Sequence, residues 1–82
     1  MPKTIFGGDH QKLVEVLIEA RKHAGLTQTE LADLLGKDQK FISLIERGQR
    51  RVDVIEFVDL ARALGRPPND LFLSVLRKME SR

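Results

Sequence analysis

Five basic side chains gather within fifteen consecutive residues near the middle of the chain: Lys37, Lys40, Arg47, Arg50 and Arg51. Residues 37–51 carry five basic and two acidic side chains, a net charge of +3. The four basic and five acidic residues of 1–36 give −1, and the one basic and three acidic residues of 52–64 give −2. A short segment that carries the highest positive charge of the chain is typical of a protein that contacts phosphate groups. A solvated surface loop is the alternative that charge alone leaves open.

Side chains able to hydrogen-bond the edges of nucleotide bases lie in the same segment. Glutamine can pair with adenine, lysine with guanine, and serine with either base. If residues 38–47 form a helix, Ile42 and Ile45 point inward, toward the rest of the protein. The outward face then carries the candidates for contacts to bases: Gln39, Lys40, Ser43 and Leu44.

Hydrophobic periodicity and capping signals predict five helices, at residues 9–24, 28–35, 38–47, 53–64 and 68–80. The predicted helix starts and ends rest on capping side chains and on glycines: Asp9, Thr27 with Glu30 in a capping box, Asp38 and Asp53, then Gly25, Gly36, Gly48 and Gly65. Besides Ile42 and Ile45, the predicted inward positions are Leu13, Leu17, Ala20, Ala24, Leu31, Leu34 or Leu35, Val54, Phe57, Leu60, Ala61 and Leu64. Because no segment alternates between apolar and polar residues for long, we expect an all-α domain.

Length and composition narrow the class of protein. With 82 residues the chain suffices for one domain, and we expect residues 1–8 to form a flexible N-terminal arm and residues 9–82 the domain. The chain has no cysteine, and His10 and His23 have no evident catalytic or metal-binding partner, so we expect no enzyme, metal or cofactor. Without a long apolar run or a signal-peptide pattern, we expect a cytoplasmic protein with no membrane contact.

The segment GLTQTELADLLGKDQKFISLIERG, followed by RRVDVIEFVDLARALG, resembles the Cro and phage-repressor-like family of helix-turn-helix regulators, the XRE family. The resemblance covers about residues 13–72. It implies a compact five-helix bundle in which the third helix, residues 38–47, reads the major groove of double-stranded DNA. The chain's length and its apolar fifth helix are also similar to the short controller proteins of restriction-modification systems, which bind DNA as dimers.

Carried over position by position, the resemblance implies contacts to phosphates or base edges from ten residues: Gln28, Thr29, Lys37, Gln39, Lys40, Ser43, Leu44, Arg47, Arg50 and Arg51. It also implies a structural ion pair between Arg21 and Glu46, which links the first helix to the end of the third. The sequence departs from the family pattern at Leu44, where members often carry a polar or basic residue. It also places an acidic residue, Asp38, close to the expected DNA backbone, where we expect it to serve as a helix cap.

The apolar residues of the last two helices predict self-association, because together they form a larger apolar surface than a small monomer normally exposes: Ile55, Val58, Leu71, Phe72, Val75, Leu76 and Met79. The alternative is that the fifth helix folds over Ile55 and Val58. We therefore expect a sequence-specific transcriptional regulator that binds a near-palindromic operator as a homodimer. The competing hypothesis is an antitoxin-type interaction module that holds a partner protein through its apolar C-terminal surface.

Overall fold

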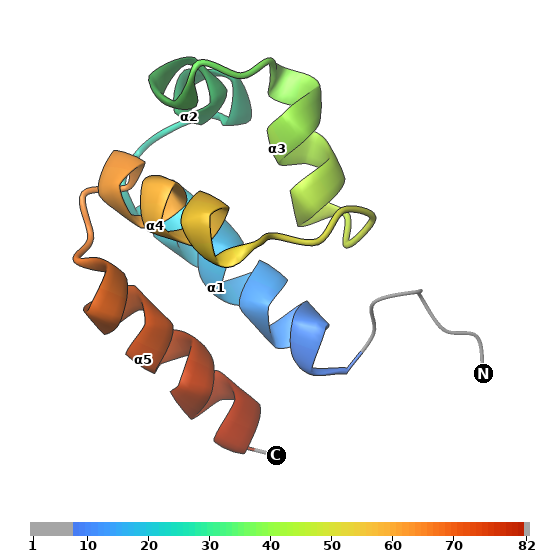
Figure 1. Cartoon of the computed structure of the whole chain (residues 1–82), viewed down its shortest axis with the longest axis vertical. Coiled ribbons are helices and arrows are strands. Elements are labelled where there is room, and N and C mark those ends of the chain that lie inside the picture. The colour runs from blue at the N-terminus through green and yellow to red at the C-terminus, as the bar shows by residue number, and fades with distance from the viewer. Residues whose placement is uncertain (1–7, 82) are drawn as a thin grey trace.

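The computed structural model describes residues 8–81, and within them the chain forms five α-helices and no strand. The helices are α1 (Asp9–His23), α2 (Gln28–Leu35), α3 (Gln39–Glu46), α4 (Val54–Ala63) and α5 (Pro68–Glu80) (Figure 1). The predicted all-α five-helix fold is confirmed, with helix ends that differ from the prediction by only one residue or so. Apart from Gly8, the predicted N-terminal arm lies outside the described residues.

Local capping determines where three of the helices begin. Thr27 and Glu30 form the predicted capping box at α2, because Thr27 Oγ1 accepts the Glu30 N–H at 3.0 Å and Glu30 Oε1 accepts the Thr27 N–H at 2.9 Å. Asp38 caps α3 by accepting the Phe41 N–H at 3.1 Å. Asp53 caps α4 in the same way.

The predicted cap of α1 is wrong. Gly8 occupies the cap position and no side chain caps this helix. Asp9 lies in the first turn instead, where its negative charge favours the positive end of the helix dipole.

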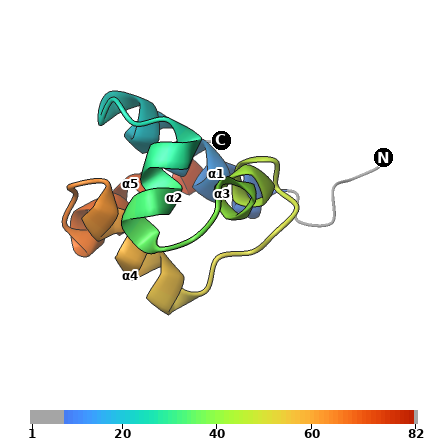
Figure 2. The ribbon, with the colours of Figure 1, turned by 90° about the horizontal axis from the view of Figure 1, so that it is seen from above.

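The turn between α2 and α3 depends on Gly36, whose φ of 69° is in the left-handed region that favours glycine. The following amide, Lys37 N–H, donates to the Ala32 carbonyl at 2.9 Å and closes the turn. The chain therefore changes direction within three residues, and α2 and α3 pack against each other as a helix-turn-helix (Figures 1 and 2).

The remaining helices support this pair. α1 packs against both α3 and α5, and α4 packs against both α2 and α5. Ala32 and Ala61 have no exposed surface, and their small side chains allow α2 and α4 to approach closely. None of the helices in residues 8–81 has the length and apolar character that a membrane crossing requires.

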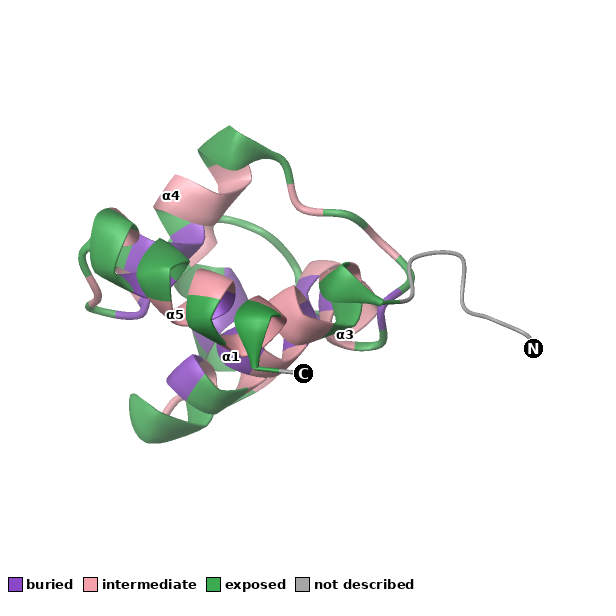
Figure 3. Cartoon of the chain, turned by 90° about the horizontal axis from the view of Figure 1, so that it is seen from below, coloured by how far each residue is buried: buried purple, intermediate pink, exposed green. Residues whose placement is uncertain are grey.

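The predicted core is correct at most positions but wrong at Ala24 and Val54. Ala24 lies beyond the last turn of α1, and Val54 is the first residue of α4, so both are exposed, Val54 to 76%. Figure 3 shows this exposed N-terminal turn of α4. Conversely, Val14 and Val16 are buried, because α1 contacts helices on two sides and needs a wider apolar face.

Candidate nucleic-acid interface

The third helix has one buried and one outward face. Ile42 and Ile45 are 1% and 2% exposed and hold α3 on the core. At about 100° per residue, the five outward positions fall within an arc of about 140°: Gln39, Lys40, Ser43, Leu44 and Arg47. Gln39, Lys40 and Arg47 are exposed, while Ser43 and Leu44 are half-buried. The structure therefore brings the predicted base-contacting residues together on one face.

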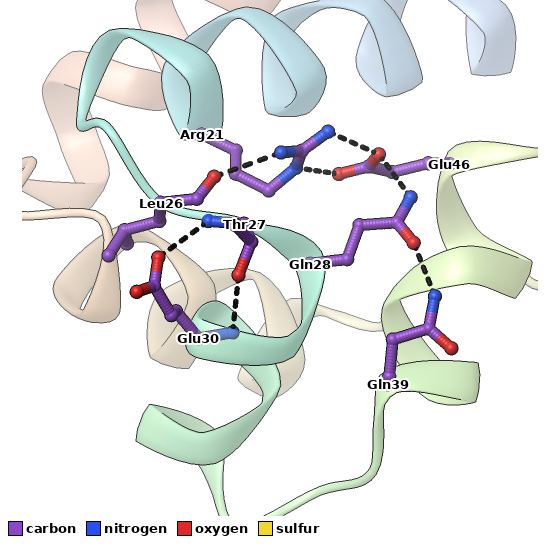
Figure 4. A network of polar contacts seen from close by, with 7 residues as sticks. All are labelled: Arg21, Leu26, Thr27, Gln28, Glu30, Gln39 and Glu46. Carbon is purple, nitrogen blue, oxygen red and sulfur yellow. Dashed lines mark hydrogen bonds and ion pairs between the residues drawn. The ribbon is translucent and has the colours of Figure 1, made fainter.

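Beside this face, a partly buried ion pair joins α1 to the end of α3. Arg21 Nε and Nη2 donate to the two carboxylate oxygens of Glu46, at 2.7 and 3.0 Å, and Arg21 Nη1 donates to the Leu26 carbonyl at 2.9 Å (Figure 4). The side chains of Arg21 and Glu46 are 13% and 8% exposed. The hydrogen bonds to Glu46 raise the pKa of Arg21, so the guanidinium stays protonated.

Two glutamines extend this network from the ion pair to the first turn of α3. Gln28 Nε2 donates to Glu46 Oε1 at 2.9 Å, and Gln28 Oε1 accepts a hydrogen bond from Gln39 Nε2 (Figure 4). Gln28 thus sits between Glu46 and Gln39, with its amide orientation fixed by both. Gln39 keeps its carbonyl oxygen and a second N–H, which are the two groups that a glutamine needs to pair with adenine.

The predicted phosphate-contacting residues lie near α3, but they differ in exposure and in the groups that they contact. Thr29 and Arg51 are exposed, and the Arg47 Nε donates weakly to the Ser43 carbonyl at 3.4 Å. The Lys37 ammonium lies 5.3 Å from the centre of the Phe41 ring. Arg50, in contrast, is half-buried in an ion pair.

The partner of Arg50 is Glu56, at 2.7 Å. Neither the sequence pattern nor the resemblance indicated this pair. Hydrogen bonds from Arg50 and from the Asp53 N–H lower the pKa of Glu56 to about 2, so its carboxylate is ionised at neutral pH.

The residues predicted for self-association divide into two groups. Leu71 and Val75 are 0% and 4% exposed and belong to the core, so neither can supply exposed interface surface; the prediction is corrected at these two positions. They are four residues apart and lie on the inner face of α5. Val58, Leu76 and Met79 are half-buried, whereas Ile55 and Phe72 are 70% and 52% exposed.

Phe72 also lines an apolar groove of about 580 Å³. Residues from the start of α1, the start of α4 and α5 line it, among them Leu13, Val54, Val58 and Phe72. Phe72 contacts Phe57 edge to face, with ring centres 6.1 Å apart. Val54 was predicted to be buried, although its place directly after the Asp53 cap puts it in the exposed first turn of α4.

Known proteins similar to this chain also contain a helix-turn-helix. The helix-turn-helix family model matches residues 17–71. An uncharacterized HTH-type transcriptional regulator of Sinorhizobium fredii is 41% identical over 58 residues, which are 70% of this chain and 75% of that protein. A second such regulator, from Methanothermobacter thermautotrophicus, is 41% identical over 56 residues, 67% of this chain and 81% of that protein.

Two solved structures are similar over most of the chain. An XRE-family like protein from Pseudomonas syringae pv. tomato is 45% identical, with a TM-score of 0.79 and 84% of each chain covered. A restriction-modification controller protein from Aeromonas hydrophila is 39% identical, with a TM-score of 0.73, and covers 80% of this chain and 100% of its own. The chain therefore belongs to the XRE-type helix-turn-helix family and is a DNA-binding transcriptional regulator rather than an enzyme.

Proposed function

We propose that the protein controls transcription as a homodimer, with α3 of each protomer in the major groove of one half of a near-palindromic operator. The observation that carries this proposal is the outward face of α3. Gln39, Lys40 and Ser43 share that face, and each can hydrogen-bond a base edge. The opposite face of α3 is packed on the core through Ile42 and Ile45, so these side chains are presented by a rigid element.

Contacts to the DNA backbone would flank this reading face. Lys37 precedes α3, while Arg47 and Arg51 follow it, and the first turn of α2 carries Gln28 and Thr29 beside free backbone N–H groups. Such contacts set the register of the protein on the duplex but carry no sequence information directly. They also explain why the positive charge of the chain is concentrated in residues 37–51. A role at DNA places the protein inside the cell.

Dimerisation is supported by the apolar surface on the side of the chain where α4 begins. Ile55 and Phe72 are 70% and 52% exposed, and Phe72 lines the groove. Burying both side chains would stabilise a domain of this size. Arg51 and Asp53, from the loop after α3, line the same groove. A second protomer seated there would lie next to the DNA-contacting loop, which favours two recognition helices facing one duplex.

The same apolar surface favours the second candidate function, an interaction module that holds an unrelated partner protein. Gentle purification from the native host distinguishes these two candidate functions. A stoichiometric unrelated protein bound to the chain would favour the interaction module, whereas a complex containing only this chain would favour the regulator.

Selection of bound sequences from a random DNA pool tests the proposed function. We expect one enriched sequence with two similar half-sites in inverted orientation, whose centres are about 34–36 Å apart, one turn of the duplex. A pool without enrichment would contradict sequence-specific recognition. Enrichment of a single half-site would contradict binding by a symmetric dimer.

Gln39 provides a test of base reading. Replacing Gln39 with alanine should weaken binding to the selected site by about 1–3 kcal/mol and relax the preference at one or two positions in each half-site. Binding to random DNA should change little, because backbone contacts remain. Titration of both duplexes at one salt concentration measures the difference, and an equal loss on both would show that Gln39 does not read a base.

A further inference from the structure

Arg50 lies in the loop that joins α3 to α4, the yellow loop in Figure 2, and three other groups of the protein hold its guanidinium. Its Nη1 and Nη2 donate to the two carboxylate oxygens of Glu56, at 2.9 and 2.7 Å, and Nη1 also donates to the Arg51 carbonyl at 2.8 Å. The guanidinium carbon lies 4.6 Å from the centre of the Phe41 ring. One side chain therefore contacts α3, the loop and α4 together.

These contacts make Arg50 poorly suited to bind a phosphate. Its bidentate pairing with Glu56 uses the forked geometry with which arginine grips a phosphate, and the carboxylate cancels its charge. Glu56 is itself held, because its Oε1 accepts the Asp53 N–H at 3.0 Å within the α4 capping box. Turning Arg50 toward DNA would leave an unpaired carboxylate close to the phosphates.

Phe41 links the turn between α2 and α3 to the contacts around Arg50. Lys37, in the turn between α2 and α3, and Arg50, in the loop after α3, both lie over the Phe41 ring. Phe41 is partly buried and packs against the core. The two loops that flank the recognition helix are therefore both placed relative to one side chain of that helix.

We propose that Arg50 is a positioning residue, which holds the loop after α3 so that Arg47 and Arg51 contact the DNA backbone while Gln39 contacts a base. This inference rests on the proposed mode of DNA binding and replaces the phosphate contact that the resemblance implies for Arg50. The dependence of DNA affinity on salt distinguishes the two roles, because each lost phosphate contact lowers the slope of log K against log salt by about 0.9.

The test compares the full-length protein with four variants: R50A, R50K, E56Q and R51A. Affinities for the selected operator and for random DNA are measured at several salt concentrations, below the melting temperature of every variant. R51A is the control for loss of a phosphate contact, and it should lose affinity for both duplexes together with part of the salt slope. R50K keeps the charge but has neither the forked donors nor the planar stacking group.

For R50K, which keeps the charge, we expect operator affinity to fall about tenfold, random-DNA affinity to change less than twofold, and the salt slope to stay at the wild-type value. R50A should lose at least as much operator affinity, and it should also weaken binding to random DNA because it leaves the Glu56 carboxylate without its cation. E56Q distinguishes the two roles most clearly, because it removes a negative charge but keeps an oxygen for the capping box. General electrostatics predicts tighter binding by E56Q, whereas loss of positioning predicts weaker operator binding. E56Q also remains informative if the Arg50 variants fail to fold.

Three results would overturn the proposal: a slope reduced in R50A as in R51A with wild-type behaviour in R50K, unchanged operator affinity in the folded Arg50 variants, or tighter operator binding by E56Q. The first result would identify Arg50 as a phosphate ligand. The second would show that Arg50 stabilises the fold but does not affect DNA recognition. Failure of the proposed function itself would be visible separately, because the wild-type protein would then bind operator and random DNA equally.

Discussion

Replacing Arg21 with methionine should lower the free energy of unfolding by about 3–5 kcal/mol. The reason is Glu46, whose side chain is 8% exposed and accepts two hydrogen bonds from Arg21. Without Arg21 the largely buried carboxylate of Glu46 keeps the neutral donor of Gln28, and it recovers only part of its hydration. Methionine matches the apolar stem of arginine, so the loss of packing is small and the loss of charge pairing dominates.

Thermal unfolding measures this effect, since a domain of this size shifts its melting temperature by roughly 4–8 °C per kcal/mol. Arg66→Met is the matched control. It removes the same type of side chain from an ion pair with Asp70, whose side chain is 56% exposed, and should cost about 1 kcal/mol at most. Replacing Arg21 and Glu46 together with apolar residues should recover much of the stability. If Arg21→Met melts no earlier than Arg66→Met, the pair at Glu46 is not a structural element.

The helices could be predicted because the signals that define them lie within a few residues of one another. Thr27 and Glu30 form their capping box across three residues, and Gly36 stops α2 through its own backbone conformation. Such signals are independent of the rest of the fold. The choice of Ile42 and Ile45 as the inner face of α3 succeeded for the same reason, because residues three apart share a helix face.

The polar cluster of Arg21, Glu46, Gln28 and Gln39 beside the outward face of α3 could not be derived from local pattern. Arg21 and Glu46 are 25 positions apart, and only the family resemblance joined them. The hydrogen bond that Gln28 donates to Glu46 spans 18 positions, and the one that it accepts from Gln39 spans 11. They depend on the angle between α2 and α3, which no residue spacing specifies. The pair between Arg50 and Glu56 was missed because a basic residue in a basic segment offers no sign of its partner.

The fifth helix shows where amphipathic pattern becomes ambiguous. Its apolar residues form two adjacent stripes, one through Leu71 and Val75 and one through Phe72 and Leu76. Either stripe could face the core. The structure buries the first against the rest of the chain and leaves Phe72 52% exposed, so the expected interface is reduced to the second stripe and the start of α4.

Ile55→Glu should convert the proposed dimer into a folded monomer. Ile55 is 70% exposed and contributes little to the core, so the substitution tests association without removing a buried side chain, as a change at Val75 would. A glutamate on each protomer would bring like charges together across the two-fold axis of a symmetric interface. Sedimentation at micromolar concentration should show a wild-type dimer and a monomeric variant. Leu34→Glu, on α2 and 61% exposed, is the matched control and should remain dimeric.

The effect of Ile55→Glu on the operator should be larger than that of any single base contact. In a dimer the second recognition helix binds as if intramolecularly, an advantage of roughly 100- to 10,000-fold that the monomer loses. Random-DNA binding by each protomer should persist, because the cations of residues 37–51 are untouched. A wild-type protein that stays monomeric both free and on the operator would contradict the dimer. A variant that still dimerises would place the interface away from the start of α4, since two buried glutamates facing each other there could not be tolerated.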